Sequence, residues 1–467
     1  MENWKSKKVL VMGLGVLGGG LATAKWLVNQ GAKVTVTDLR SRAELTNSIK
    51  KLGPAGKKIS FVLGRHRLVD FQNNEVIVVN PAVRRESEFL KASRKAGRIL
   101  TNDARIFFDS VTNPIIAVTG TRGKTTTTNW IAHLLKGKYP KVVAAGNSSD
   151  IALLDLAARL SDKKMPLVIE LSSWQLEFLN DSQKGPDIAV ITNIYPDHLN
   201  RYKNVRDYAL AKANIFKSQR ADQFLILNKD NNWTKFFLTK KIKAGICFSS
   251  SRNRKIIFDK KNILPAGFLN KSILEKGEHN VANLLAAVAA VRLFGLNWLE
   301  IKNRIKNLPA ISYRQEIVLK KNNLAIINDS AGTSPDAVMA AIDRFRKQGR
   351  VFLITGGTDK NLIFNDLAKK IKENINPTDL FLLNGSATKK LLKELEKMHY
   401  FKNQPIRLFE DLGNLLKTAN LYFGKKVSAK ERKFLVFSPG AASFEKFKNE
   451  FDRGDKFNLL MKRIFKS

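Results

Sequence analysis

The chain has almost no cysteine and few histidines. Cys247 is the one cysteine among 467 residues, which excludes a disulfide within the chain and fits a reducing compartment. No Cys/His cluster has zinc-site spacing, and no apolar run is long enough to span a membrane. Residues 9–24 follow a short basic segment, as in a signal peptide, but five of these sixteen residues are glycine. We therefore expect no signal peptide and a cytoplasmic protein.

Acidic residues are also scarce relative to basic ones. The 81 Lys and Arg residues stand against 41 Asp and Glu, which gives a net charge of +40. The lysines are spread along the chain rather than grouped, so a basic surface without a special role is one interpretation. Attraction to anions such as nucleotides or acidic substrates is the other. Scattered charge without interleaved aromatic residues makes dedicated nucleic-acid binding the minority interpretation.

The segment 115–126 has the order of a strand, a glycine-rich loop and a helix start. The apolar run 115–119 leads into Gly120-Thr-Arg-Gly-Lys124-Thr125-Thr. Backbone N–H groups of such a loop, the helix dipole and the lysine form an anion site, and the Thr125 hydroxyl can bind a phosphate-bound Mg²⁺. Val118 stands where the strict P-loop has glycine, so this is the shorter GTxGKTT form. We interpret it as a nucleoside-triphosphate site, with an ordinary strand-to-helix turn as the alternative.

The N-terminal residues have the pattern of a dinucleotide-binding fold. A strand at 9–12 precedes Gly13, Gly15 and Gly18, and Asp38 follows Gly18 by twenty residues. A Rossmann fold has its ribose-binding acid at this spacing. Taken alone the pattern would favour NAD, but a single glycine fingerprint is a weak signal.

The remainder of the chain alternates strands with helices and predicts an α/β fold with mostly parallel sheets. We expect three domains: residues 1–112, Rossmann-like; 113–308, a central P-loop-type ATPase domain; and 309–467, Rossmann-like. Central strands are expected at 141–145, 166–170, 187–192 and 223–227, and those of the third domain at 324–328, 351–355, 379–383 and 434–438. Residues 230–275 predict only short strands and loops. Ligands gather where such strands end, which brings Glu170 and His198 to the edge that holds the loop.

Eight motifs together resemble the Mur ligase family in their order along the whole chain. They are GTRGKTT at 120–126, ELSSWQLE at 170–177, DH at 197–198, EHNVAN at 278–283, YRQE at 313–316, NDS at 328–330, GGTDK at 356–360 and SPGAASFEKFKN at 438–449. As isolated residues, Glu170 and His198 would more simply be a strand-end acid and a loop histidine. The ordered set is far more specific than any one motif.

The resemblance implies a function in cytoplasmic peptidoglycan precursor synthesis. Within the family the chain resembles the members that add D-glutamate to UDP-N-acetylmuramoyl-L-alanine with ATP, through an acyl phosphate. The N-terminal domain would hold the UDP part, the central domain ATP, and the third domain the incoming amino acid. The implied cofactors are ATP, two Mg²⁺ ions and a carbamylated Lys212, and we expect a monomer with no membrane or nucleic-acid partner.

The resemblance also assigns roles to individual positions. The catalytic residues would be Lys124, Glu170, His198 and Lys212. ATP contacts would come from Gly120, Thr121, Arg122, Gly123, Lys124, Thr125, Thr126, Asn280, Asn283, Arg314 and Asp329. The metal ligands would be Thr125, Glu170, His198 and Lys212. Substrates would be held by Leu17, Asp38 and Arg40 at the UDP moiety, by Asn147, and by Thr333, Lys360 and Ser443 at the acceptor carboxylates.

Three departures from the family pattern concern the acceptor. The segment that commonly reads NDSKAT here has Ala331 and Gly332 in place of Lys-Ala, Tyr313 replaces a histidine, and an aromatic residue of the acceptor pocket is shifted to Phe451. Another Mur ligase or an L-glutamate-adding variant therefore stays open. A folylpolyglutamate synthase would not need residues 1–112, an NAD dehydrogenase would leave the phosphate loop without a role, and a nucleic-acid-binding ATPase would be favoured only by the charge.

Overall fold

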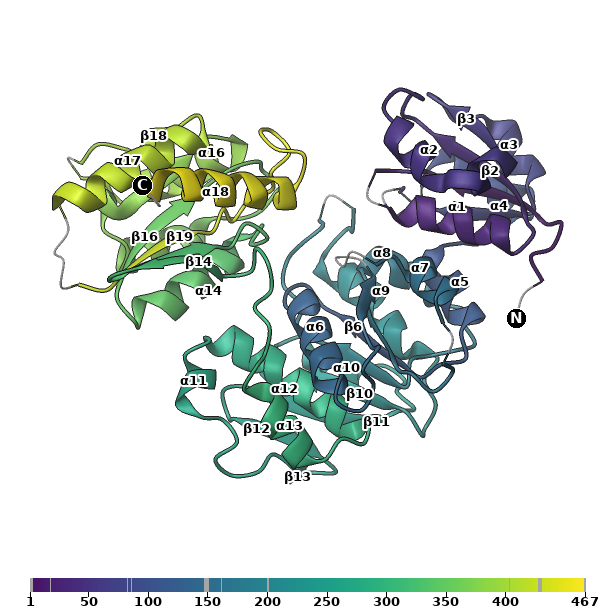
Figure 1. Cartoon of the computed structure of the whole chain (residues 1–467), viewed down its shortest axis with the longest axis horizontal. Coiled ribbons are helices and arrows are strands. Elements are labelled where there is room, and N and C mark those ends of the chain that lie inside the picture. The colour runs from purple at the N-terminus through teal and green to yellow at the C-terminus, as the bar shows by residue number, and fades with distance from the viewer. Residues whose placement is uncertain are drawn as a thin grey trace. The chain divides into compact units, whose positions relative to one another are not determined.

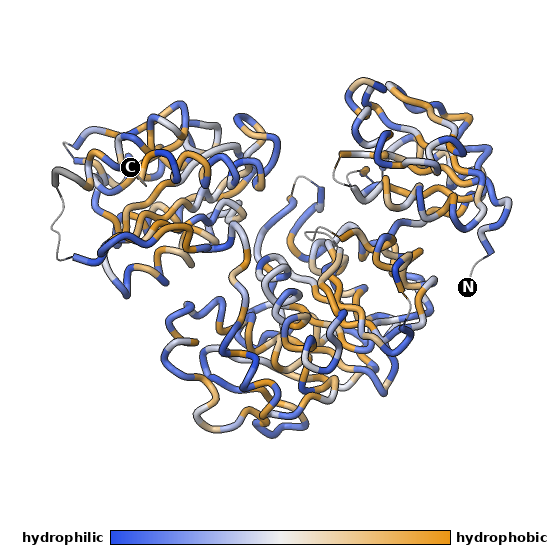
Figure 2. The backbone as a smooth tube through the Cα atoms, viewed as in Figure 1, coloured by the Kyte–Doolittle hydropathy of each residue, from blue (hydrophilic) through white to orange (hydrophobic). Residues whose placement is uncertain are grey.

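The computed structural model has the α/β architecture that the sequence predicts, with three mostly parallel sheets (Figure 1). The structure describes residues 3–16, 18–81, 83–84, 86–146, 151–160, 162–199, 201–402, 404–426 and 431–465. Apolar segments, orange in Figure 2, form the strands within the sheets. None of the helices in these ranges is both long and apolar enough to cross a membrane.

The first sheet consists of five parallel strands in the order β3-β2-β1-β4-β5. The strands are β1 (Lys8–Met12), β2 (Lys33–Asp38), β3 (Ile59–Leu63), β4 (Val76–Val79) and β5 (Ile99–Thr101). The helices are α1 (Gly19–Asn29), α2 (Thr46–Leu52), η1 (Gly53–Lys58), α3 (Leu68–Asn73), α4 (Glu88–Lys95) and α5 (Asp103–Ser110). The strand order reverses at β1, so the segment that begins at Gly13 lies where doubly wound sheets bind ligands.

The second sheet has eight strands in the order β13-β12-β11-β10-β9-β6-β8-β7, and only β12 and β13 run antiparallel to their neighbours. The strands are β6 (Ile115–Thr119), β7 (Ala144–Gly146), β8 (Leu167–Glu170), β9 (Ile188–Ile191), β10 (Phe224–Asn228), β11 (Gly245–Ser250), β12 (Lys255–Phe258) and β13 (Lys261–Asn262). Because β6 lies between β9 and β8, the segments that follow all three strands meet at one edge.

Nine helices lie between residues 113 and 308 of the described chain. They are α6 (Lys124–Leu135), α7 (Leu153–Ala158), α8 (Ser173–Leu176), η2 (Glu177–Leu179), α9 (Val205–Lys217), α10 (Thr234–Leu238), α11 (Lys271–Leu274), α12 (Glu278–Leu293) and α13 (Trp298–Ile305). Residues 230–275 contain the expected short strands, and the two short helices α10 and α11 in addition.

The third sheet has the order β14-β15-β19-β16-β17-β18, with only β14 antiparallel to its neighbour. The strands are β14 (Glu316–Lys321), β15 (Leu324–Asn328), β16 (Arg350–Thr355), β17 (Leu380–Leu383), β18 (Leu408–Phe409) and β19 (Lys433–Phe437). The helices are α14 (Pro335–Arg346), α15 (Asn365–Asn374), η3 (Pro377–Asp379), α16 (Ser386–Lys397), α17 (Leu412–Lys426) and α18 (Glu450–Phe465). Successive strand residues such as Ile326 and Ile327 enter two different apolar clusters, because α14–α16 cover one face and α17 with α18 the other.

The chain divides into two compact units. Unit 1 contains residues 1–195, 201–268 and 282–308, and unit 2 contains residues 196–200, 269–281 and 309–467. Unit 1 therefore holds the first and second sheets, whose buried apolar side chains join in one cluster. Unit 2 holds the third sheet.

Candidate active site

The glycine-rich loop of unit 1 connects the end of β6 to the start of α6. Gly120 has φ +144° and Gly123 has φ +81°, in the region that favours glycine. A Cβ on Gly120 would lie 2.0 Å from Thr192 Oγ1, and a Cβ on Gly123 would lie 2.1 Å from Asn283 Oδ1. Both glycines are therefore required for the close approach of the loop to its neighbours.

Residues that follow β9 hold this loop by hydrogen bonds. Thr121 N donates to Asn193 O (2.9 Å), and Arg122 N donates to Asn193 Oδ1 (2.8 Å). Arg122 O accepts from Thr192 Oγ1 (2.6 Å) and Asn193 Nδ2 (3.1 Å). Two N–H groups that the sequence predicted as anion donors thus bond to the protein itself. The first turn of α6, whose N–H groups have no partner within a helix, is the part suited to an anion.

This first turn also brings a hydroxyl to a buried carboxylate. Thr125 Oγ1 donates to Glu170 Oε2 at 2.8 Å, and Glu170, the last residue of β8, is 2% exposed. Lys124 Nζ donates to Thr121 O at 3.2 Å. Within the described ranges no three His, Cys, Asp or Glu residues form a group that could hold a metal by themselves. Thr125 and Glu170 instead fit Mg²⁺ of the kind that takes one or two protein oxygens and shares phosphate oxygens.

Lys212 lies on α9 and is almost fully buried, with 1% of its surface exposed. Its Nζ lies 3.4 Å from the hydroxyl of Thr119, the last residue of β6, and 4.7 Å from the centre of the Tyr208 ring. Unit 1 therefore has Glu170, Asn283 and Lys212 near the end of β6 and the glycine-rich loop, whereas His198, which the sequence also places at this edge, belongs to unit 2.

In unit 2 the aspartate before His198 forms an ion pair. Lys360 Nζ lies 3.1 Å from Oδ1 of the buried Asp197. His198 has φ +54°, and its Nε2 lies 4.0 Å from Asp197 Oδ2. The charge of Lys360, which the resemblance assigns to an acceptor carboxylate, is thus already balanced by an acidic side chain of the protein.

Asp329 is a buried carboxyl at the end of β15. Its Oδ1 accepts from Gln315 N (3.0 Å) and its Oδ2 accepts from Ser438 Oγ (2.7 Å). Burial raises the pKa of Asp329 to about 7, against these hydrogen bonds and the positive charges of Arg314 and Arg344, which lower it. Asp329 is therefore a group whose protonation changes near neutral pH.

Replacement of Asp329 by asparagine tests this pKa. The folded value of about 7 lies above the ordinary value of 3.8, so between these two pH values the folded chain keeps a proton that the unfolded chain has lost. The free energy of unfolding then falls as the pH rises from about 4 to 7, by about 4 kcal/mol at most. Asp329→Asn mimics the protonated carboxyl and should lack this fall. Urea unfolding of both proteins at pH 4.5, 5.5 and 7.5 measures the difference, and parallel pH profiles would contradict it.

The other predicted residues of unit 2 have varied surroundings. Asn280, on α12, donates from Nδ2 to Lys276 O at 3.0 Å, and Arg314 N donates to Ile311 O at 3.2 Å. Thr333 is half-buried in the connection before α14. Ser443 is buried, and its hydroxyl has no hydrogen-bond partner among the described residues. A buried hydroxyl without a partner is costly unless a ligand completes it.

The altered acceptor segment has its own local geometry. A Cβ on Gly332 would lie 2.6 Å from Asp329 Oδ2, so the residue that replaces the family's alanine lets the chain turn closely around Asp329. Tyr313 has φ +61° and donates from its hydroxyl to Asp455 Oδ1 at 2.7 Å. Its ring centre lies 5.9 Å from that of Phe451, so two of the three departures are in contact.

Arg453 is a buried residue that sequence reasoning missed. Its guanidinium is fully buried and donates to Ser330 Oγ (3.1 Å), Ser330 O (2.8 Å), and the carbonyl oxygens of Ala441 and Ala442 (3.1 Å each). Burial lowers the pKa of Arg453 to about 10. It therefore joins the NDS segment to the SPGAAS segment. The available sequence signal is its place four residues before Phe457, on the buried face of α18.

In the first sheet, the Asp38 carboxylate accepts hydrogen bonds from the protein's own backbone. Its Oδ2 accepts from Gly15 N (3.0 Å) and its Oδ1 accepts from Arg40 N (2.9 Å). The Arg40 guanidinium lies 3.8 Å from Asp38 Oδ1 and is about half exposed. Asp38 therefore fixes the segments that follow β1 and β2. The predicted substrate residues Leu17 and Asn147 lie outside the described residues.

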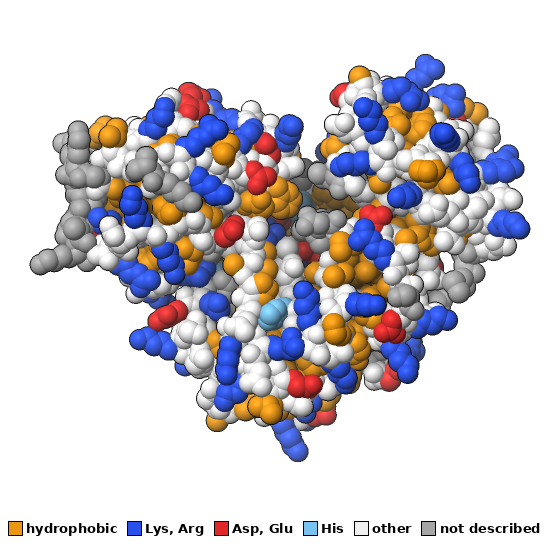
Figure 3. All heavy atoms as spheres, in the orientation of Figure 1, with side chains coloured by type: hydrophobic (Ala, Val, Ile, Leu, Met, Phe, Trp, Pro, Cys, Tyr) orange, Lys and Arg blue, Asp and Glu red, His pale blue; other side chains and the backbone are white. Residues whose placement is uncertain are grey.

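Basic side chains are widely distributed on the surface. On the face shown in Figure 3, the described Lys and Arg side chains are scattered over the chain and interrupted by Asp, Glu and apolar groups. This distribution agrees with the even spread of lysines along the sequence.

Comparisons with known proteins agree over nearly the full length. The Mur ligase middle domain model matches residues 118–291, and the Mur ligase MurD-like, N-terminal domain model matches residues 7–101. A UDP-N-acetylmuramoylalanine–D-glutamate ligase of Roseiflexus sp. (strain RS-1) is 35% identical, covering 97% of this chain and 98% of the relative. A ligase of the same name from Borreliella afzelii (strain PKo) is 34% identical and covers 99% of each chain. The solved UDP-N-acetylmuramate-alanine ligase MurC of Thermotoga maritima shares the fold, with a TM-score of 0.57 and 19% identity over 98% of this chain and 99% of that one.

Proposed function

This chain belongs to the Mur ligase family, and from that premise we propose that it is the ATP-dependent ligase that joins D-glutamate to UDP-N-acetylmuramoyl-L-alanine. The observation that carries the ATP-dependent chemistry is the hydrogen bond of Thr125, which follows Lys124 at the start of α6, to the buried Glu170 at the end of β8. The identity of the acceptor rests on the relatives, which are named for D-glutamate.

In this proposal, each of the three expected domains binds one of the substrates. Residues 1–112 bind the UDP moiety, residues 113–308 bind ATP, and residues 309–467 bind the amino acid. The enzyme acts in the cytoplasm as a monomer, in the synthesis of peptidoglycan precursors. The reaction has two steps: the alanyl carboxylate attacks the γ-phosphate of ATP to give an acyl phosphate and ADP, and the amino group of glutamate then attacks the acyl carbon and displaces phosphate.

The residues of unit 1 fit ATP and a first Mg²⁺. Lys124 and the first turn of α6 neutralise charge on the phosphoryl group that is transferred, and Gly120, Thr121, Arg122, Gly123 and Thr126 shape the loop. Thr125 and Glu170 hold the ion, which when bound offsets the negative charge of the phosphates. Their oxygens already lie 2.8 Å apart, so neither side chain has to travel far to share one ligand.

By family position we assign two further Mg²⁺ ligands, His198 of unit 2 and Lys212 of unit 1, with Lys212 as a carbamate. A carbamate replaces the ammonium group of lysine by carboxylate-like oxygens, which suit Mg²⁺ far better. The burial of Lys212 at the end of β6 supports this assignment, because its side chain reaches the same strand from which the phosphate loop begins.

The remaining residues are assigned by family position. Asn280, Asn283, Arg314 and Asp329 contact ATP. Leu17, Asp38, Arg40 and Asn147 bind the UDP-linked substrate. Thr333, Lys360 and Ser443 bind the acceptor carboxylates. The buried hydroxyl of Ser443 supports the last assignment, since it has no partner among the described residues. Lys360 would have to exchange its ion pair with Asp197 for the carboxylate of the incoming amino acid.

Omission of one component at a time tests the function. Phosphate release should require ATP, Mg²⁺, UDP-N-acetylmuramoyl-L-alanine and D-glutamate together, and mass spectrometry should detect one new UDP-linked product that contains glutamate. Release that depends on DNA or RNA instead would indicate the nucleic-acid-binding ATPase that the net charge suggests.

Substitution of Gly123 by alanine tests the loop geometry. The new Cβ would lie 2.1 Å from Asn283 Oδ1, so either α6 or Asn283 must move. A displacement of about 1 Å at a phosphate site lowers turnover roughly 100-fold. Gly295→Ala is the matched control, because Gly295 has φ +100° but no atom within 4 Å of its added Cβ. Steady-state turnover should fall in Gly123→Ala alone. An equal fall in Gly295→Ala would mean that backbone strain, and not the contact with Asn283, causes the loss.

A further inference from the structure

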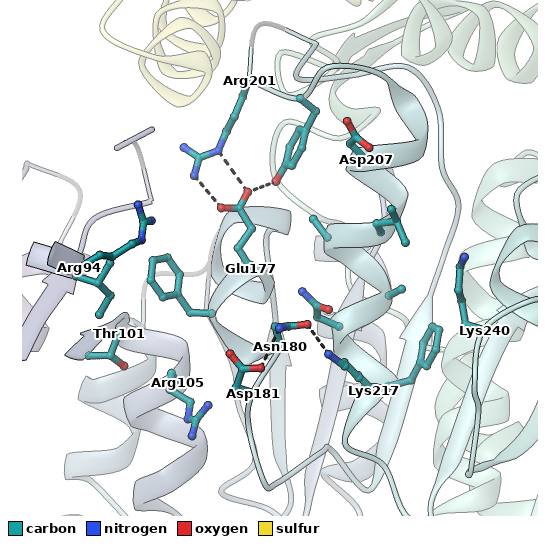
Figure 4. A pocket seen from close by; sticks show the side chains of 18 of the residues that line it. Arg94, Thr101, Arg105, Glu177, Asn180, Asp181, Arg201, Asp207, Lys217 and Lys240 are labelled. Carbon is teal, nitrogen blue, oxygen red and sulfur yellow. Dashed lines mark hydrogen bonds and ion pairs between the residues drawn. The ribbon is translucent and has the colours of Figure 1, made fainter. Parts of the chain in front are cut away.

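Unit 1 contains a cavity of about 1020 Å³ between the first and second sheets (Figure 4). Its walls come from β5, α5, the segment 177–181 and α9. Seven basic and five acidic residues line it, so its charge does not select one class of ligand. Its upper edge is different, because Arg201 and Glu177 face each other there, joined by two marked contacts (Figure 4).

Arg201 uses every nitrogen of its guanidinium. Nη1 donates to the carbonyl oxygens of Pro81 and Val83, at 2.9 Å each. Nη2 and Nε donate to the carboxylate of Glu177, at 3.1 and 3.4 Å. The guanidinium also lies 5.0 Å from the centre of the Trp174 ring. Only 11% of the side chain is exposed, so these contacts form in a place where water competes little.

The contacts of Arg201 join three functional segments, one of which is its own. Pro81 and Val83 follow β4 in the first sheet, and the preceding Asn80 packs against Gly13, where an added Cβ would lie 3.0 Å from Asn80 Nδ2. Glu177 and Trp174 belong to the segment that begins at Glu170. Arg201 itself lies in the β9–α9 connection, whose Thr192 and Asn193 hold the phosphate loop.

We propose that Arg201 is a positioning residue for the UDP-linked substrate. This inference rests on the proposed function, because that substrate must reach from the nucleotide-binding edge of the first sheet to the phosphate loop of the second. Arg201 donates to the Pro81 and Val83 carbonyl oxygens, which follow β4 in the first sheet. It also belongs to the β9–α9 connection, which holds the phosphate loop of the second sheet. It thereby sets the spacing over which the alanyl carboxylate is presented to the phosphate.

Only a guanidinium meets this geometry. Its planar fork donates to a carboxylate on one side and to two carbonyl oxygens on the other, whereas the single ammonium of lysine reaches one side alone. Arg201→Lys is therefore expected to behave like Arg201→Gln. The open cavity beside the side chain gives small solutes access, so methylguanidinium at millimolar concentration should restore part of the activity of Arg201→Ala.

The test compares steady-state constants and direct binding. Arg201→Gln and Arg201→Lys should raise KM for UDP-N-acetylmuramoyl-L-alanine about tenfold or more, while KM for ATP stays within about twofold. The Kd for the UDP substrate without ATP should rise in parallel. Arg105→Gln is the control, because Arg105 lines the same cavity but pairs with Asp109. Melting temperatures identify any variant that is merely unfolded.

The outcomes separate the two proposals. Folded Arg201 variants with unchanged affinity for the UDP substrate, or with equal rises in both KM values, would overturn the positioning role. Rescue of Arg105→Gln by methylguanidinium would do the same. If the wild-type protein binds the UDP substrate but does not turn over, the proposed function fails. The loss of binding in Arg201→Gln would still support the inference in that case.

Discussion

Lys124→Ala is expected to abolish phosphoryl transfer while binding of UDP-N-acetylmuramoyl-L-alanine stays close to that of the wild type. Lys124 is the first residue of α6, and its Nζ is held 3.2 Å from Thr121 O at the loop. Its charge is needed when negative charge moves on to the leaving ADP, and loss of such a group costs at least about a thousandfold in rate. Phosphate release measures the first effect, and calorimetric titration with the UDP substrate measures the second.

Lys136→Ala is the matched control for this variant. Lys136 follows the last residue of the same helix and is exposed, so the same substitution there should leave turnover within about twofold of the wild type. Near-normal phosphate release by Lys124→Ala would contradict the assignment of the loop. Loss of both phosphate release and UDP-substrate binding would indicate damage to the fold instead.

Lys212→Ala is expected to lower activity by a factor of about a thousand, and short-chain carboxylic acids should restore part of it. The side chain is buried at the end of β6, so its removal leaves space into which acetate or propionate can bring the oxygen ligands that the proposed carbamate supplies. Turnover is measured at increasing acid concentration and constant ionic strength, with chloride as the salt control.

Lys217→Ala serves as the control on the same helix. Lys217 is exposed and bonds to Asn180 Oδ1, so its loss should neither lower activity nor create a response to acetate. Unchanged activity in Lys212→Ala would remove the carbamate from the account. A folded but inactive Lys212→Ala that no carboxylate restores would show that the lysine acts in another way.

The sequence predicted those parts of the fold in which an apolar run is bounded by turn residues. The strands β6, β15 and β16 fall at the expected positions within one residue. Strand β3 was not predicted, because Ile59–Leu63 is a short run that pairs only at a sheet edge. Strand β14 was missed because it begins at the polar Glu316 and its burial is only partial.

The candidate site was predictable where one motif contributes the chemistry. The Gly120–Thr125 segment carries residue types that indicate phosphate and Mg²⁺ by themselves, whereas Glu170 stands out only through the ordered set of motifs. Arg201 and Arg453 could not be found in this way, because both donate to backbone carbonyl oxygens of distant segments. A carbonyl oxygen is present at every residue, so no sequence pattern identifies it as the partner of a particular arginine.

Asn193 is an intermediate case. It lies directly after an apolar strand, where side chains of parallel sheets gather around ligands, and the sequence places it in the segment that leads to His198. Its side-chain amide instead accepts a hydrogen bond from Arg122 N and donates one to Arg122 O. The position was therefore predictable, but its role in holding the loop depends on a packing that only the folded chain reveals.

The most direct test of the central claim is phosphate release from ATP in the presence of UDP-N-acetylmuramoyl-L-alanine, with D-glutamate, L-glutamate and other amino acids added one at a time. Turnover is expected with D-glutamate alone, despite the Ala331-Gly332 replacement in the acceptor segment. Turnover with a different amino acid and none with D-glutamate would contradict this claim.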